Sequence, residues 1–235
     1  MSDPVRLQRE YYRRTAERYD SWHLKDPEHV FALAFMASMI NFLGIRSVLD
    51  VGTGTGRVPL ALKQNHPSLK IVGIEPSPEL REQGYKKGLS RNELRDGDAL
   101  KLAYQDGAFD LVCEFSILHH LPDPSRAVRE MLRVARKAIF ISDANIFGVG
   151  HLHSRLLKQL LRTTKLWPIA NLIRTGGRGY SITADDGVWY RYSVFNDYSL
   201  IAAHCKSVHI MNTSAAGSNL FRSAPHVALL GIKSG

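Results

Sequence analysis

The chain has 235 residues, of which 44% are hydrophobic, so it is long enough to bury the core of one domain. No apolar run approaches the ~20 residues of a membrane-spanning helix, and the polar, arginine-rich N-terminus lacks the apolar core of a signal peptide. The two cysteines, Cys113 and Cys205, lie outside any metal or disulfide motif and predict reduced residues in a cytoplasmic protein. The net charge of +9 leaves anionic partners open.

Two helices are expected before the first strand. Residues 7–21 form a helical segment rich in arginine and tyrosine, and residues 30–43 form a second, strongly apolar helix.

The most informative stretch is a strand that breaks into glycines and restarts as a helix. Residues 47–51 are a short apolar run that predicts a buried strand. Gly52, Gly54 and Gly56 follow at alternate positions, and helical apolar spacing begins at Val58. Such a turn brings backbone N–H groups close to a ligand.

The glycine spacing excludes two common nucleotide sites. A dinucleotide loop needs a third small residue, and here Arg57 or Pro59 would stand in that place. A P-loop needs Gly-Lys-Ser/Thr, which is absent from the sequence. The acidic Asp50 just ahead of the loop favours a ligand with a cationic end, such as an amino acid ammonium, over a pyrophosphate.

Further carboxylates follow the next predicted strands. Residues 70–74 form a second buried strand that ends at Glu75, whose carboxylate can accept hydrogen bonds from both hydroxyls of a ribose. Asp98, within Gly-Asp-Ala, follows a weaker third strand and could accept from an adenine amino group. Residues 109–114 form a fourth strand, and residues 115–121 after it contain Leu-His-His-Leu.

In this order and at these distances, the motifs resemble the class I S-adenosylmethionine-dependent methyltransferases, especially the small-molecule branch that includes sugar and quinone methyltransferases. The resemblance covers roughly residues 8–145 and a terminal pair of strands. It implies S-adenosyl-L-methionine as the cofactor and an α/β, Rossmann-like fold. This fold has a seven-stranded, mostly parallel sheet with helices on both faces and its last strand antiparallel between the fifth and sixth.

The resemblance also implies cofactor contacts. Asp50 and the glycine loop would hold the methionine part, Glu75 the ribose, and Asp98 with Ala99 the adenine. Tyr19 would close over the methionine end as part of an N-terminal lid, although an aromatic residue that packs the helix down is an equal alternative. The full set is Tyr19, Asp50, Gly52, Thr53, Gly54, Gly56, Glu75, Pro76, Asp98, Ala99 and Phe115.

Three residues are candidates for the acid/base chemistry. An oxygen acceptor benefits from a base near neutral pH, and histidine has a suitable pKa. The resemblance to glycoside O-methyltransferases assigns this role to His119, His120 and Asp143. Alternatively, Leu-His-His-Leu is a packing element, and Asp143 only orients a histidine or caps a turn with Asn145.

The remaining elements complete one domain over residues 1–235. Residues 124–135 predict a helix and residues 137–142 a fifth strand; a helix over 196–204 and strands over 207–212 and 227–232 end the chain. We expect residues 1–43 to form a helical lid and residues 146–195 a substrate-cap insertion. Since ligands bind at the carboxyl ends of parallel strands, the candidate residues should converge there.

The insertion is basic and aromatic. Residues 151–166 alternate leucines with cations, residues 174–180 form a flexible basic loop, and an aromatic patch follows. Residues 151–191 contain seven Lys/Arg against two acids, Asp185 and Asp186. This composition suits an anionic or glycosyl acceptor; a solvated basic face and a helix on an anionic membrane surface are the alternatives. The aromatic patch consists of Trp189, Tyr190, Tyr192 and Phe195.

The sequence excludes some methylation classes. Glu-Phe-Ser-Ile stands where nucleobase amino methyltransferases carry Asn/Asp-Pro-Pro-Tyr/Phe, and Cys113 lacks the Pro-Cys context of cytosine methylation. A catechol-type metal site would need carboxylates after strands four and five. Asp143-Ala-Asn145 half fits, but the Asp after strand four is missing, so we expect no metal. The sequence predicts O-methylation of a small molecule. An RNA methyltransferase, favoured by the pI near 9.7, and a non-catalytic cofactor-binding protein are the alternatives.

Overall fold

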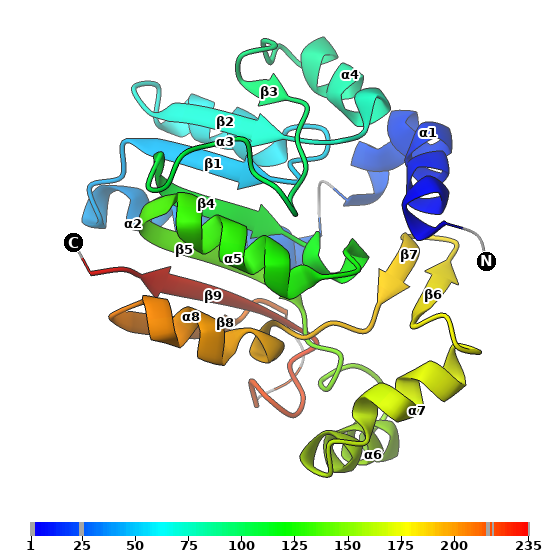
Figure 1. The fold of residues 1–235 in the computed structure, drawn as a ribbon. Helices are drawn as coiled ribbons and strands as arrows, with labels where there is room; N and C mark the ends of the chain where they lie inside the picture. Colours follow the sequence, from blue (N-terminus) through cyan, green and yellow to red (C-terminus); the bar gives the residue numbers. More distant parts are fainter. Residues whose placement is uncertain (1–2, 24–25, 215–216, 218, 235) are drawn as a thin grey trace.

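A seven-stranded sheet forms the centre of the computed structural model, which describes residues 3–23, 26–214, 217 and 219–234 (Figure 1). The strand order is β3-β2-β1-β4-β5-β9-β8. β9 runs antiparallel to both β5 and β8, and the other neighbours pair in parallel. This topology confirms the predicted fold class. The strands are β1 (Ser47–Val51), β2 (Lys70–Ile74), β3 (Leu94–Arg95), β4 (Phe109–Phe115), β5 (Ala135–Ala144), β8 (Ser207–Asn212) and β9 (His226–Ile232).

Helices cover both faces of this sheet because successive strand residues point to opposite sides. Val48 packs with residues of α2 and α3, whereas its neighbour Leu49 packs with residues of α5 and α8. Likewise, Leu111 packs on the α2 and α3 side and its neighbour Val112 on the α5 and α8 side. The sheet is therefore buried on both faces, as its near-continuous apolar strands require. The covering helices are α2 (Pro27–Phe42), α3 (Arg57–Asn65), α5 (Pro124–Val134) and α8 (Tyr198–His204).

Helix starts follow the local sequence. Asp123 caps α5 by accepting a hydrogen bond from the Arg126 N–H at 3.0 Å, and Pro124 occupies the first helical position. Ser77 caps α4 (Pro78–Lys86) in the same way, at 3.3 Å from the Leu80 nitrogen. Both caps fix a chain segment just beyond the carboxyl end of a strand.

The insertion after β5 differs from its prediction in two respects. It contains two helices, α6 (Leu152–Thr163) and α7 (Trp167–Arg174), and an antiparallel hairpin of β6 (Tyr180–Thr183) and β7 (Gly187–Tyr190) that the sequence did not predict. The predicted basic loop therefore ends where β6 begins. The predicted aromatic patch is also divided. Trp189 and Tyr190 lie on β7, but Tyr192 and Phe195 are buried in the main core, where they present no face to a ligand.

The N-terminal helix α1 (Pro4–His23) packs against this hairpin at the carboxyl edge of the sheet. The Gln8 side chain donates to the carbonyl of Asp186 at 3.2 Å and accepts from the Val188 N–H at 2.6 Å. Two segments distant in sequence thus close over one edge of the sheet. Among the described residues, no helix combines the length and the apolar character needed to cross a membrane.

Candidate active site

The loop between β1 and α3 adopts a conformation that requires glycine. Gly52, Gly54 and Gly56 have φ angles of 71°, 58° and 86°, in the left-handed region. A Cβ on Gly52 would also lie only 2.5 Å from Cγ2 of Ile117. The loop therefore presents bare backbone at the end of β1, as the sequence predicted.

Two adjoining cavities, each of about 320 Å³, meet at this loop. Gly52 and His120 line both cavities, so the two cavities adjoin at this loop. Neither cavity is lined by Gly54, Gly56 or Asp143, which lie behind the residues that form the cavity walls. The other predicted residues divide between the two: Tyr19, Asp50, Thr53, Phe115 and His119 line the first cavity, and Glu75, Pro76, Asp98 and Ala99 line the second.

Two carboxyl groups at strand ends are buried beside the loop. Burial raises the pKa of Asp50 to about 7 and that of Glu75 to about 7. Glu75 is fixed through its Oε2, which accepts from the Gly54 N–H at 3.1 Å, and its Oε1, which accepts from the Ser77 N–H at 2.9 Å. Each oxygen keeps a lone pair for a ligand hydroxyl.

The second cavity continues from Glu75 along apolar walls. Asp98 lies beyond the end of β3, with its Oδ1 accepting from the Leu100 N–H at 2.8 Å. Leu100 and Ile117 line the same cavity. A hydroxyl acceptor at one end, a second carboxylate and apolar sides between them match the parts of a nucleoside.

Helix α1 closes the first cavity from outside. The ring of Tyr19 lies on the glycine loop, because a Cβ on Gly54 would be 3.4 Å from its Cε1. The next residue, Asp20, accepts from the Thr55 hydroxyl and pairs with Lys87 at 2.7 Å. Tyr19 thus packs the helix down and lines the cavity, so the two interpretations from the sequence are compatible.

The histidine pair follows β4 in a short 3₁₀ helix (Leu118–His120). Nδ1 of His119 lies 2.7 Å from Oδ1 of Asp143, whose Oδ2 accepts from the Leu118 N–H at 2.8 Å. Asp143 therefore orients the ring and the backbone that carries it. His120 places its Nδ1 2.7 Å from the carbonyl of Val188, which can only accept, so this nitrogen carries the proton.

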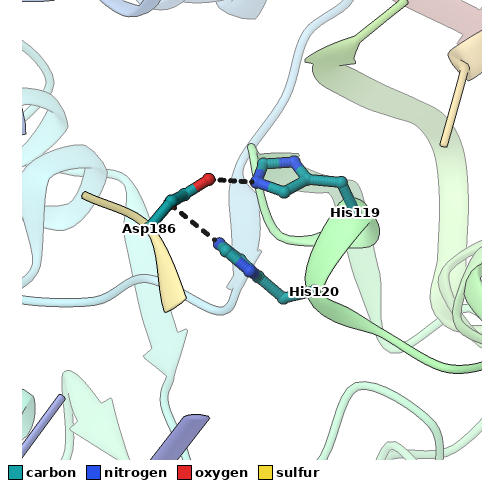
Figure 2. A group of neighbouring side chains, drawn as sticks. All are labelled: His119, His120 and Asp186. Atoms are coloured by element: carbon teal, nitrogen blue, oxygen red, sulfur yellow. Dashed lines mark hydrogen bonds and ion pairs between the residues drawn. The ribbon is translucent and has the colours of Figure 1, made fainter. Parts of the chain in front are cut away.

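Asp186 completes the cluster from the turn between β6 and β7 (Figure 2). Its two carboxylate oxygens face the two Nε2 atoms, at 3.2 Å from His119 and 3.3 Å from His120. Burial opposes a charged ring, but the carboxylates of Asp143 and Asp186 outweigh it and raise the pKa of His119 to about 10. Burial likewise opposes ionisation of Asp186, but the hydrogen bonds of both histidines lower its pKa. The sequence did not single out Asp186, whose only signal was being one of two acids in a basic insertion.

The family profile described as a methyltransferase domain matches residues 49–141, from β1 to β5. This stretch carries the glycine loop, Glu75, Asp98 and the histidine pair. Over residues 49–141 the chain is therefore similar to methyltransferase domains.

The curated proteins that match this region are named for different methyl acceptors. Ajmaline N-methyltransferase of Rauvolfia serpentina is 33% identical over 149 residues, which cover 54% of this chain and 49% of that protein. A demethylmenaquinone methyltransferase of Deinococcus radiodurans is 39% identical over 38% of either chain. A phosphatidylethanolamine N-methyltransferase of Cereibacter sphaeroides is 39% identical over 48% of this chain and 56% of its own. The matched region thus spans at most little more than half of these relatives.

Solved structures extend the likeness to the whole fold. Magnesium protoporphyrin IX methyltransferase from Synechocystis PCC 6803 superposes with a TM-score of 0.59, at 14% identity, covering 99% of this chain and 100% of its own. A possible histamine N-methyltransferase from Thermotoga maritima gives 0.58 at 19% identity, covering 96% and 99%. At these identities the likeness establishes the fold alone.

Among the described residues, the first cavity also contains a group that has the composition of a metal site. Ligand atoms of His119, His120 and Asp186 lie within 4.8 Å of one another. The separations of 3.2 and 3.3 Å suit hydrogen bonds and equally suit neighbouring ligands of one zinc ion, at about 3.3 Å. The high pKa of His119 favours a proton in that position. That no metal takes part remains a prediction, which a chelator would test.

Sequence reasoning missed further residues around the pair. Glu114 at the end of β4 is fully buried, accepting from the Ile117 N–H at 3.0 Å and from the Ser142 N–H at 2.9 Å. Burial and the nearby Asp143 raise its pKa well above the usual value. Ser116 has a positive φ of 60° and pairs with Nε2 of His226, a residue of β9 that lines the first cavity. Only contacts across the fold bring these residues together.

Proposed function

We propose that this protein transfers the methyl group of S-adenosylmethionine to a small-molecule acceptor. The observation that carries the proposal is the pair of cavities meeting at Gly52. Glu75 would accept from the ribose hydroxyls, and Asp98 with Ala99 would contact the adenine. Asp50 and the backbone of the glycine loop would hold the amino acid end. When bound, the cofactor supplies an electrophilic methyl group on its sulfonium.

For the acceptor we infer a hydroxyl group. Held by Asp143, His119 has its Nε2 at the first cavity, where it faces Asp186. While Asp186 stays there, the ring remains protonated. An acceptor hydroxyl that replaces Asp186 removes one carboxylate from the imidazolium and so lowers its pKa. The ring would then release its Nε2 proton to solvent, and the neutral Nε2 would accept the hydroxyl proton when that oxygen is methylated and the methyl–sulfur bond of the cofactor breaks.

The charge at the cavity favours a neutral, glycosyl-type acceptor over an anionic one. Arg57 is accompanied by several carboxyl groups in the lining of the first cavity. The sequence predicted that cations of the insertion would bind an anionic acceptor. Two of them, Arg155 and Arg162, line neither cavity. The lining acids are Asp26, Glu28, Asp50, Asp185 and Asp186.

N-methylation of an amine is the second candidate. The acid-rich lining would attract a protonated amine, and two of the named relatives are N-methyltransferases. An amine needs only to arrive deprotonated, so it makes a smaller demand on His119.

Isothermal titration with S-adenosylhomocysteine, and then with NAD, tests the cofactor. We expect micromolar affinity for the first and no binding of the second, because the loop lacks the third small residue of a dinucleotide site. Binding of neither compound would contradict the proposal. Binding should be followed by a screen of hydroxylated and amine acceptors that measures S-adenosylhomocysteine release. A salt-sensitive shift on RNA would support the RNA alternative, and affinity without product would support a non-catalytic protein.

A further inference from the structure

Helix α6 exposes its apolar face to solvent and turns its polar face toward the protein, the reverse of an ordinary surface helix. Its leucines Leu152, Leu156, Leu157 and Leu160 point away from the protein, each with 56% to 59% of its surface exposed. A surface helix normally buries its apolar stripe and solvates its polar face. In Figure 1, α6 and α7 lie apart from the central sheet, beyond β8 and β9.

The polar side of α6 holds it to the body. Lys158 is buried and donates from Nζ to the carbonyls of Ile146 at 2.5 Å and Val149 at 2.6 Å. The amide of Gln159 donates to the carbonyl of Arg222 at 3.1 Å, and the guanidinium of Arg162 stacks 4.6 Å from the ring centre of Phe147. These contacts fix the direction in which the leucines face.

Helix α7 repeats the arrangement. Ile169, Leu172 and Ile173 are exposed at helical spacing, with Ile173 reaching 77%. Asn171 faces inward and donates to the carbonyl of Gly179 at 3.3 Å, and Trp167 packs edge-on against Phe147. We call the outward side chains the α6–α7 surface: Leu152, Leu156, Leu157, Leu160, Ile169, Leu172 and Ile173.

The charged residues of the segment that carries this surface are all positive. Residues 146–184 contain six Lys/Arg and no Asp or Glu. Of these cations, Lys165, Arg174 and Arg178 are exposed, and Arg155 and Arg162 are partly so. Apolar side chains flanked by cations are typical of helices that lie in the interface of an anionic membrane. Two copies of the surface would instead bring like charges together.

We propose that the α6–α7 surface docks on an anionic lipid bilayer. Its leucines and isoleucines enter the acyl boundary while the surrounding cations meet lipid phosphates. The docked segment leads directly through β6 into the turn that holds Asp186 over the histidine pair. Resting on the proposed function, the inference extends to the acceptor, an amphiphilic molecule that the methyltransferase takes from the bilayer.

Co-sedimentation of the full chain with vesicles tests the docking. We expect binding to vesicles of phosphatidylcholine with phosphatidylglycerol, weak binding to phosphatidylcholine alone, and a loss of binding as salt increases. The triple variant Leu156→Ser, Leu160→Ser, Ile173→Ser should bind the anionic vesicles at least about tenfold more weakly. The variant Lys165→Glu, Arg174→Glu should weaken the same binding without removing an apolar side chain.

The matched control is Phe42→Ser, which removes a 79% exposed aromatic side chain at the end of α2, outside the α6–α7 surface. It should leave vesicle binding unchanged, and every variant should keep its affinity for S-adenosylhomocysteine. That affinity reports the proposed function separately, because it needs no lipid. Absence of binding to anionic vesicles would overturn the docking. So would a dimer that the triple variant converts to monomers, since it would assign the surface to self-association.

Discussion

Replacing His119 with asparagine is expected to lower kcat by about 10²- to 10⁴-fold, the range for loss of a general base. Asparagine keeps a polar side chain of similar reach but cannot take a proton at neutral pH. The affinity for S-adenosylhomocysteine should change by less than about threefold, because the ring faces Asp186 and the acceptor side of the cavity. The measurements are steady-state kinetics with the acceptor found by screening, and titration calorimetry.

Two variants, Asp143→Asn and Asp186→Asn, distinguish the orientation of the His119 ring from the charge placed beside it. Because Asp143 holds Nδ1 at 2.7 Å, Asp143→Asn should lower kcat nearly as far as the histidine variant. Both carboxylates raise the pKa of His119 to about 10, so either variant should move the imidazole titration to lower pH in NMR spectra. A kcat for His119→Asn within a few-fold of the unchanged protein would reject the base and favour an amine acceptor.

Treatment with a chelator tests whether a proton or a metal ion lies between Asp186 and the two histidines. We expect dialysis against EDTA to leave kcat unchanged, because an imidazolium already satisfies Asp186. Added zinc should inhibit by occupying the two Nε2 atoms. Loss of activity in EDTA that a divalent metal restores would contradict this expectation and make His119, His120 and Asp186 metal ligands.

The sheet could be predicted because each strand is a short apolar run with a clear end. β1, β2 and β8 have the bounds that the sequence indicates. Asp50 lies in β1 one residue before its end, and Glu75 directly follows β2. In a parallel sheet the carboxyl ends share one edge, so residues after different strands meet there. This rule brought His119 and Asp143 together without any knowledge of the contact between them.

The insertion could not be predicted in the same way. The hairpin β6–β7 has little apolar alternation, and its contact between His119 and Asp186 joins residues 67 positions apart. The periodicity of α6 distinguishes a leucine face from a basic face but does not say which one meets the protein. The basic face meets the protein because Lys158 finds buried hydrogen-bond acceptors there. These acceptors are the backbone carbonyls of Ile146 and Val149, in an irregular segment.

Glu75→Ala is expected to weaken binding of S-adenosylhomocysteine by ~1.5–3 kcal/mol, about 10- to 150-fold, the range for hydrogen bonds to a charged group. Glu75→Gln is the matched variant, since it keeps the size of the side chain and one acceptor oxygen. It should weaken binding less than alanine. Calorimetry on both variants gives the affinities, and thermal unfolding checks that the loop at Gly54 remains folded.

The affinity should also depend on pH because of the same group. Burial raises the pKa of Glu75 to about 7, and a protonated carboxyl accepts poorly from two ribose hydroxyls. Binding then requires loss of the proton, so Glu75 alone should lower the affinity by up to about tenfold for each pH unit below 7, with no further change above it. Asp50 adds a second such dependence, since burial raises its pKa to about 7 as well. Glu75→Gln removes one of the two groups and should halve the slope of log affinity against pH, whereas an unchanged slope would assign the whole dependence to Asp50.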